Sequence, residues 1–75
     1  MRFEGIVIGY EEVEGFRWPL LLLRGTVDGR DAEFYLLLDK DAAQRVASMG
    51  IGQALKGVGE VERREPLIIR ARDVG

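Results

Sequence analysis

The chain has 75 residues, 47% of them hydrophobic and 32% charged, a balance that supports one folded domain and argues against intrinsic disorder. It contains no cysteine and no histidine, which excludes disulfide bridges and thiolate metal sites and removes the commonest zinc ligand and catalytic base. Its net charge of −2 argues against strong nonspecific attraction to nucleic-acid phosphates.

The first predicted strand covers Arg2 to Tyr10, whose sequence RFEGIVIGY is rich in β-branched and aromatic residues. Gly5 and Gly9 interrupt this strand. Glycine inside a strand is typical of places where the backbone bends or bulges, as the first strand of a small barrel must. The acidic segment EEVEG that follows ends in glycine and predicts a loop or hairpin connection.

A hairpin is the clearest local prediction, because Asp28-Gly29 lies between the apolar runs WPLLLLRGTV and RDAEFYLLLD. Asp-Gly between two such runs is the strongest short-range signal for a two-residue hairpin turn. The turn fixes which residues of the two strands face each other. The expected facing pairs are Val27 with Arg30, Arg24 with Glu33, Leu22 with Tyr35 and Leu20 with Leu37.

That register divides the side chains of the hairpin between two faces. The inner face is apolar and should enter the core, and it carries Leu21, Leu23, Gly25, Val27, Ala32, Phe34, Leu36 and Leu38. The outer face sets Arg24 against Glu33 and Thr26 against Asp31, pairings that a solvent-facing ladder favours. The remaining outer residues are large and apolar or aromatic: Trp18, Leu20, Leu22, Tyr35 and Leu37.

An alanine-rich segment, KDAAQRVASMG, follows the hairpin and predicts a helix of about ten residues. Asp39 or Asp41 is placed to cap its start, and Asp41 to Gln44 has the spacing of a capping box. Gly50 or Gly52 would supply the left-handed residue at its end. The expected apolar stripe consists of Ala43, Val46, Ala47 and Ile51.

Two further strands complete the chain. Leu55, Gly57, Gly59 and Val61 fall on one side of the fourth strand, Arg63 to Pro66 forms a turn, and LIIRARDV is the fifth strand. The order of the elements is therefore three strands, one helix and two strands.

This order resembles the oligonucleotide/oligosaccharide-binding (OB) fold over nearly the whole chain. The resemblance is carried by Gly5 and Gly9 in the first strand and by the stretches LKGVGEV and PLIIRARDV. It implies a mainly β protein, a single domain over residues 1–75, built as a five-stranded Greek-key barrel with one helix between the third and fourth strands.

Catalysis finds no support in the sequence. Nucleophilic catalysis needs a base beside the nucleophile, and the usual base, histidine, is absent. Turn and helix-cap roles explain the closest aspartate pairs, Asp28 with Asp31 and Asp39 with Asp41. No glycine-rich stretch has the spacing of a phosphate loop. We therefore expect a binding protein that is not an enzyme, without metal or cofactor.

We expect the ligand on the outer face of the hairpin, where the resemblance to OB domains implies it. Single-stranded DNA or RNA is the first hypothesis, with aromatic rings stacking on bases and arginines following phosphates. The alternative is a protein-protein or homodimer interface built from the leucines with Trp18 and Tyr35. The candidate contact residues are Arg17, Trp18, Leu20, Leu22, Arg24, Tyr35, Leu37, Lys56, Arg63 and Arg64.

Two further alternatives stay open at this point. The helix, the acidic loop or the C-terminal tail could cover the apolar outer face, and the chain could have a purely structural role within a complex. The longest apolar run, Trp18 to Leu23, falls far short of the roughly 20 residues of a membrane helix, so we expect a soluble, cytoplasmic protein. The absence of asparagine and the plentiful arginine and glutamate suggest a thermophilic source.

Overall fold

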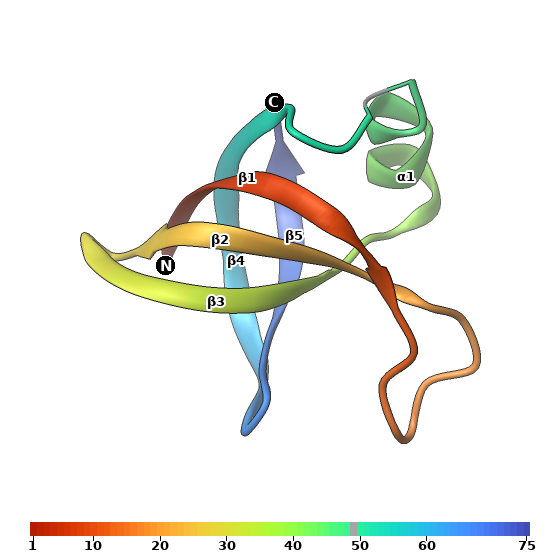
Figure 1. Ribbon diagram of the computed structural model, residues 1–75, viewed down its shortest axis with the longest axis horizontal. Coiled ribbons are helices and arrows are strands. Elements are labelled where there is room, and N and C mark those ends of the chain that lie inside the picture. The colour runs from red at the N-terminus through yellow and green to blue at the C-terminus, as the bar shows by residue number, and fades with distance from the viewer. Residues whose placement is uncertain (49) are drawn as a thin grey trace.

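The computed structural model describes residues 1–48 and 50–75, and in these residues five strands form a closed barrel with one helix between the third and fourth strands. Around the barrel the strands follow the order β1-β2-β3-β5-β4. In Figure 1, β1, β2 and β3 cross in front of β4 and β5, and α1 lies to one side of the barrel. The elements are β1 (Arg2–Glu11), β2 (Leu20–Val27), β3 (Arg30–Leu37), α1 (Lys40–Val46), β4 (Ala54–Arg64) and β5 (Leu67–Val74).

The hairpin between β2 and β3 has the predicted register, with Val27 facing Arg30, Arg24 facing Glu33 and Leu22 facing Tyr35. Asp28 and Gly29 form the turn with φ angles of 51° and 82°, the left-handed conformation that this dipeptide favours. The backbone N–H of Asp28 donates to the carbonyl oxygen of Arg2 at 2.8 Å. Its carboxylate accepts from the Arg2 N–H at 2.8 Å, so the turn is tied to the start of β1.

A β-bulge interrupts the pairing of β1 with β2. Val7 faces Leu23 and Gly9 faces Leu22, which leaves Ile8 as the extra residue. The bulge changes which side chains point outward, because a single inserted residue shifts the alternation of a strand. Beyond it, Glu11 faces Leu20 on the outer side of the sheet.

Close strand contacts in the barrel depend on glycine. A Cβ atom on Gly25 would lie 2.0 Å from the carbonyl oxygen of Glu4, and one on Gly57 would lie 2.0 Å from that of Asp73. Real Cβ atoms do not approach that closely. Glycine therefore allows the backbones of β1 and β2, and of β4 and β5, to cross closely and coil into a small barrel.

The interior of the barrel is one hydrophobic core that takes the predicted inner face of the hairpin. Phe3 and Phe34 meet edge to face at its centre, with ring centroids 5.9 Å apart. Ala32 and Leu38 pack against it from partly buried positions. The buried members are Phe3, Val7, Leu21, Leu23, Val27, Phe34, Leu36, Ala42, Val46, Leu55, Ile69, Ala71 and Val74.

Helix α1 is shorter than predicted and has a different buried face. Asp39 is the cap, since its carboxylate accepts from the N–H of Ala42 at 2.7 Å. A helix that starts there buries Ala42 and Val46, which are four residues apart. Of the predicted stripe, Val46 is buried, but Ala43, Ala47 and Ile51 are exposed, so the prediction was wrong for these three.

The segments around the helix also differ from the prediction. Gly52 has a φ of 91°, but it lies in the turn before β4 and not at the helix end. Strand β4 continues to Arg64, so the turn into β5 is confined to Glu65 and Pro66. In the described part of the chain, no helix has the length and apolar character needed to cross a membrane.

Candidate functional site

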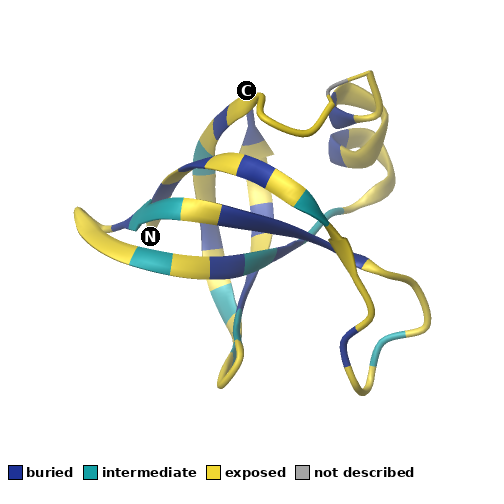
Figure 2. Cartoon of the chain, viewed as in Figure 1, coloured by how far each residue is buried: buried dark blue, intermediate teal, exposed yellow. Residues whose placement is uncertain are grey.

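The apolar part of the outer face of β2 and β3 is largely buried in the structure. Leu20 and Leu22 are each only 5% exposed, so the expectation that these leucines are displayed to a ligand was wrong. Of the alternatives considered, cover by the acidic loop matches the structure for Leu20. Val13 and Phe16, from the β1–β2 loop (residues 12–19), belong to a second hydrophobic cluster whose other members are Leu20, Tyr35, Leu37 and Ile68. Val13 is buried, whereas most of this loop is exposed (Figure 2).

Arg63 holds the β1–β2 loop in this position. Its guanidinium carbon lies 5.0 Å from the ring centroid of Phe16, and its NH1 donates to the carbonyl oxygen of Glu14 at 2.8 Å. The loop itself turns through a hydrogen bond from the Phe16 N–H to the Val13 carbonyl oxygen, with Gly15 at a φ of 95°. Arg63 is therefore engaged with the loop, whereas the sequence predicted a ligand contact.

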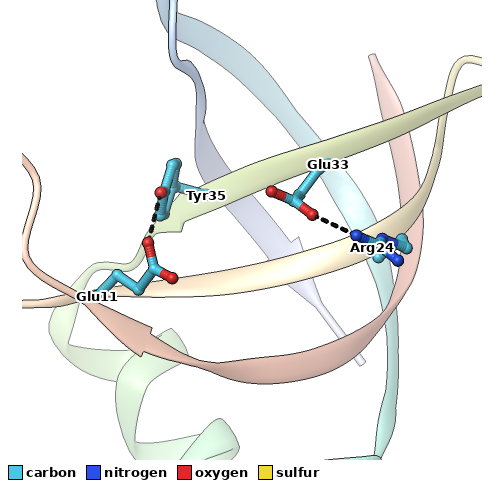
Figure 3. Close-up of polar contacts among 4 residues, drawn as sticks. All are labelled: Glu11, Arg24, Glu33 and Tyr35. Atoms are coloured by element: carbon cyan, nitrogen blue, oxygen red, sulfur yellow. Dashed lines mark hydrogen bonds and ion pairs between the residues drawn. The ribbon is translucent and has the colours of Figure 1, made fainter.

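Two more predicted contact residues are engaged with carboxylates (Figure 3). The Tyr35 hydroxyl donates to Glu11 Oε1 at 2.9 Å, and Arg24 NH2 pairs with Glu33 Oε2 at 2.8 Å. The hydrogen bond to Glu11, with smaller effects from burial and from the charges of Glu11 and Glu33, raises the pKa of Tyr35. Both groups lie on a surface where Asp31 is also exposed, which makes this face acidic.

The remaining predicted residues are exposed but are not brought together. Trp18 is 73% exposed in the β1–β2 loop, and its neighbour Arg17 is also exposed. Lys56 and Arg64 are exposed on β4, eight residues apart, which corresponds to about 26 Å along a strand. The structure thus gathers Leu20, Tyr35 and Leu37 into one cluster with Arg63 at the loop that covers it, and leaves the other cations separate.

A second surface, which the sequence analysis did not identify, lies where β1 pairs with β4. Its outward side chains are three register pairs, Arg2 with Val58, Glu4 with Lys56 and Ile6 with Ala54, and we name it the β1–β4 face. Ile6 is 46% exposed and Val58 41%, and Ile8 at the bulge is 39% exposed. A shallow groove of about 560 Å³ lies over the Arg2 to Val58 end of this face and extends to Thr26, Asp73 and Gly75.

The sequence indicates only one of the two strands of this face. The alternation of Arg2, Glu4 and Ile6 with Phe3, Gly5 and Val7 marks the outward side of the first strand. It does not show that β4, about fifty residues later, lies beside that strand. The closure of the barrel makes the two outward rows one surface.

Among the described residues, only some of the charged residues on the strands form ion pairs; those of the β1–β4 face form none, and neither do Arg30, Asp31 and Arg64. Ion pairs join Arg24 with Glu33 across β2 and β3, and Arg70 with Glu62 and Arg72 with Glu60 across β4 and β5. Among the described residues, Arg2, Glu4, Lys56 and Asp73 take part in no such pair. The β1–β4 face therefore presents charges of both signs beside exposed isoleucine and valine.

No buried side chain in the described residues is polar or charged, and residues 1–48 and 50–75 contain no group of three carboxylates placed to hold a metal ion. Comparison of the chain with protein-family models, with curated proteins and with solved structures gave no match.

Proposed function

We propose that the chain is a non-catalytic, OB-like binding module that binds a protein partner through the β1–β4 face. The strand order and the place of the helix support the resemblance to OB domains, whose single barrels serve as binding modules. The observation that carries the proposal is the distribution of exposed apolar side chains. Of the seven large ones in the described residues, Met1, Ile6, Ile8 and Val58 lie on or next to this face.

The composition of the face suits a protein-protein contact. Interfaces combine apolar and polar side chains, and on this face Ile6 and Val58 lie in opposite end rows with the Glu4–Lys56 pair between them. Because each apolar side chain is already about half buried, covering it contributes about 1 kcal/mol. Three such side chains support a modest affinity, and the surrounding charges would set the choice of partner.

Nucleic acid remains the second candidate, for one specific reason. Trp18 is the most exposed aromatic residue of the described chain and stands beside the exposed Arg17, a combination that can stack on a base and contact a phosphate. Against this candidate, Leu20 and Leu22 of the predicted platform are buried, and the Tyr35 hydroxyl is bonded to Glu11.

Site-specific photo-crosslinking distinguishes the two candidates. A photoreactive residue placed at Ile8 borders the β1–β4 face, and the same residue at Arg72, an exposed position facing outward on β5, is the matched control. After irradiation in an extract of the source cells, we expect protein adducts from position 8 and none from position 72. Ile6→Glu in the same chain should abolish them, because burying a charge in place of an apolar side chain opposes docking.

Two results of this experiment would overturn the proposal. Nuclease-sensitive adducts from position 8 would identify nucleic acid as the partner. Equal protein adducts from both positions, or adducts that Ile6→Glu leaves unchanged, would show that the β1–β4 face is not the binding surface.

A further inference from the structure

We infer that the partner on the β1–β4 face is a second copy of this chain, an inference that rests on the proposed function and makes it specific. The monomer leaves charges of both signs without ion pairs on this face, beside apolar side chains that are about half exposed. A face of one sign would repel its own copy. A face with both signs can match itself, because a two-fold contact sets residue i against j and j against i.

The pairing of β1 with β4 determines which residues meet. Consider a two-fold axis that lies between the two faces, runs parallel to the strands and is midway between β1 and β4. This axis places each β1 residue of one copy over a β4 residue of the other copy. The β4 residue that it meets has the same number as its register partner within its own chain. The three register pairs of the face are Arg2 with Val58, Glu4 with Lys56 and Ile6 with Ala54. Glu4 then faces Lys56 of the partner subunit, and Ile6 faces Ala54 of the partner subunit.

Each of these contacts is complementary. Two Glu4–Lys56 ion pairs form between the copies, where neither group has an ion-pair partner within the described chain. Isoleucine over alanine sets a large side chain against a small one, as close packing of two sheets requires. The methylene stem of Arg2 covers Val58 of the partner subunit, and long cationic side chains cover apolar surface in this way.

The groove on the face has room for the incoming side chain. Glu4 lines it, and in this arrangement the Lys56 ammonium group of the other copy lies over Glu4. The contact involves the outer side of only two strands in each copy, less than a standard interface of about 800 Å² per partner requires. The dimer should therefore be weak and depend on protein concentration.

Charge reversal tests the arrangement. In a homodimer, Glu4→Lys sets a second ammonium group against Lys56, and Lys56→Glu puts two carboxylates together. Each variant alone should therefore associate at least about tenfold more weakly than the unaltered chain. An equimolar mixture of the two variants should associate again as a heterodimer, in which opposite charges meet at the contact. Mixing leaves the neighbours within each chain unchanged, so recovery reports a contact between copies.

Sedimentation velocity over a range of concentrations measures the association, and circular dichroism establishes that each variant is folded. Glu60→Lys is the control, since it makes the same charge change on β4 where Glu60 pairs with Arg72. It should leave association unchanged. Should either single variant unfold, the double variant Glu4→Lys/Lys56→Glu replaces it, because that chain keeps both attractive contacts and should self-associate.

The outcomes separate this inference from the proposed function. If the unaltered chain is monomeric at every concentration, the inference that the partner is a second copy is wrong. Crosslinking from Ile8 to a different protein would then still support the proposed function. If neither charge reversal weakens dimerisation, the arrangement derived from the β1–β4 register is wrong. The same holds if mixing the two variants does not restore association.

Discussion

Tyr35 makes the stability of the fold depend on pH in the alkaline range. Its hydroxyl donates to Glu11, and that hydrogen bond is the main cause of its raised pKa. A group whose pKa is raised on folding stabilises the fold fully below its unfolded value, which for tyrosine is about 10. The contribution is lost as the pH rises from there through the higher pKa of the folded state.

Removing the carboxylate should therefore lower the pKa of Tyr35. In Glu11→Gln the amide oxygen still accepts the hydrogen bond, but the negative charge that opposes ionisation is gone. Absorbance titration of tyrosinate would measure the change, with Tyr35→Phe identifying the contribution of this ring among the two tyrosines. A Tyr35 titration that is the same in Glu11→Gln and in the unaltered chain would contradict the structure.

At the scale of elements, the crossing of β1 over β2 depends on Gly25. Its added Cβ would meet the Glu4 carbonyl oxygen at 2.0 Å and Gly5 Cα at 2.5 Å, and both are backbone atoms that cannot move aside alone. Gly25→Ala should lower the free energy of unfolding by about 3 kcal/mol. Gly9 is the matched control on the facing strand, because a Cβ there meets nothing within 4 Å.

Urea denaturation of the two variants checks this comparison. Gly9→Ala should remain within about 0.5 kcal/mol of the unaltered chain, as surface changes without new contacts usually do. Equal losses in the two variants would mean that general strand propensity, and not the close crossing of β1 and β2, explains the glycine at position 25.

The β1–β2 loop offers a second prediction at this scale. Arg63→Ala removes both the contact with the Phe16 ring and the hydrogen bond to the Glu14 carbonyl oxygen. Each is worth about 1 kcal/mol, so the loop should open more often. Hydrogen exchange at the Phe16 amide, which is bonded to the Val13 carbonyl oxygen, should accelerate several-fold. Arg64→Ala alters the next, exposed residue and should leave that rate unchanged, and an equal acceleration would refute the role of Arg63.

These elements also show how far local sequence reasoning extends. The β2–β3 hairpin could be predicted in register, because Asp28-Gly29 fixes the turn and the alternation on either side fixes the inner face. The buried face of α1 could not, since two aspartates offered caps and a shift from Asp41 to Asp39 rotates the helix. Leu20 could be placed on the outer face, but its burial depends on Val13 and Phe16 of the β1–β2 loop, which pack in the same cluster.

For the molecule as a whole, the limit of prediction was the contact between distant strands. The order of the elements was sufficient to predict a five-stranded barrel with its helix in the correct place. The β1–β4 face depends on the pairing of Glu4 with Lys56, and no feature of either segment specifies that neighbour. The sequence therefore predicted a site on the β2–β3 hairpin, whose register it determines well. The candidate site in the structure is the β1–β4 face, which forms only when the barrel closes.

Net charge gives a prediction for the molecule as a whole. With a charge of −2, and three glutamates against one arginine in residues 11–18 around Trp18, phosphate neutralisation offers little binding energy. Single-stranded DNA and RNA at low salt should therefore show no saturable binding at tens of micromolar protein. The single tryptophan is an intrinsic probe, because a base stacked on its exposed ring would quench its emission. A salt-sensitive quench that disappears in Arg17→Ala would contradict this expectation and locate a nucleic-acid site on the β1–β2 loop.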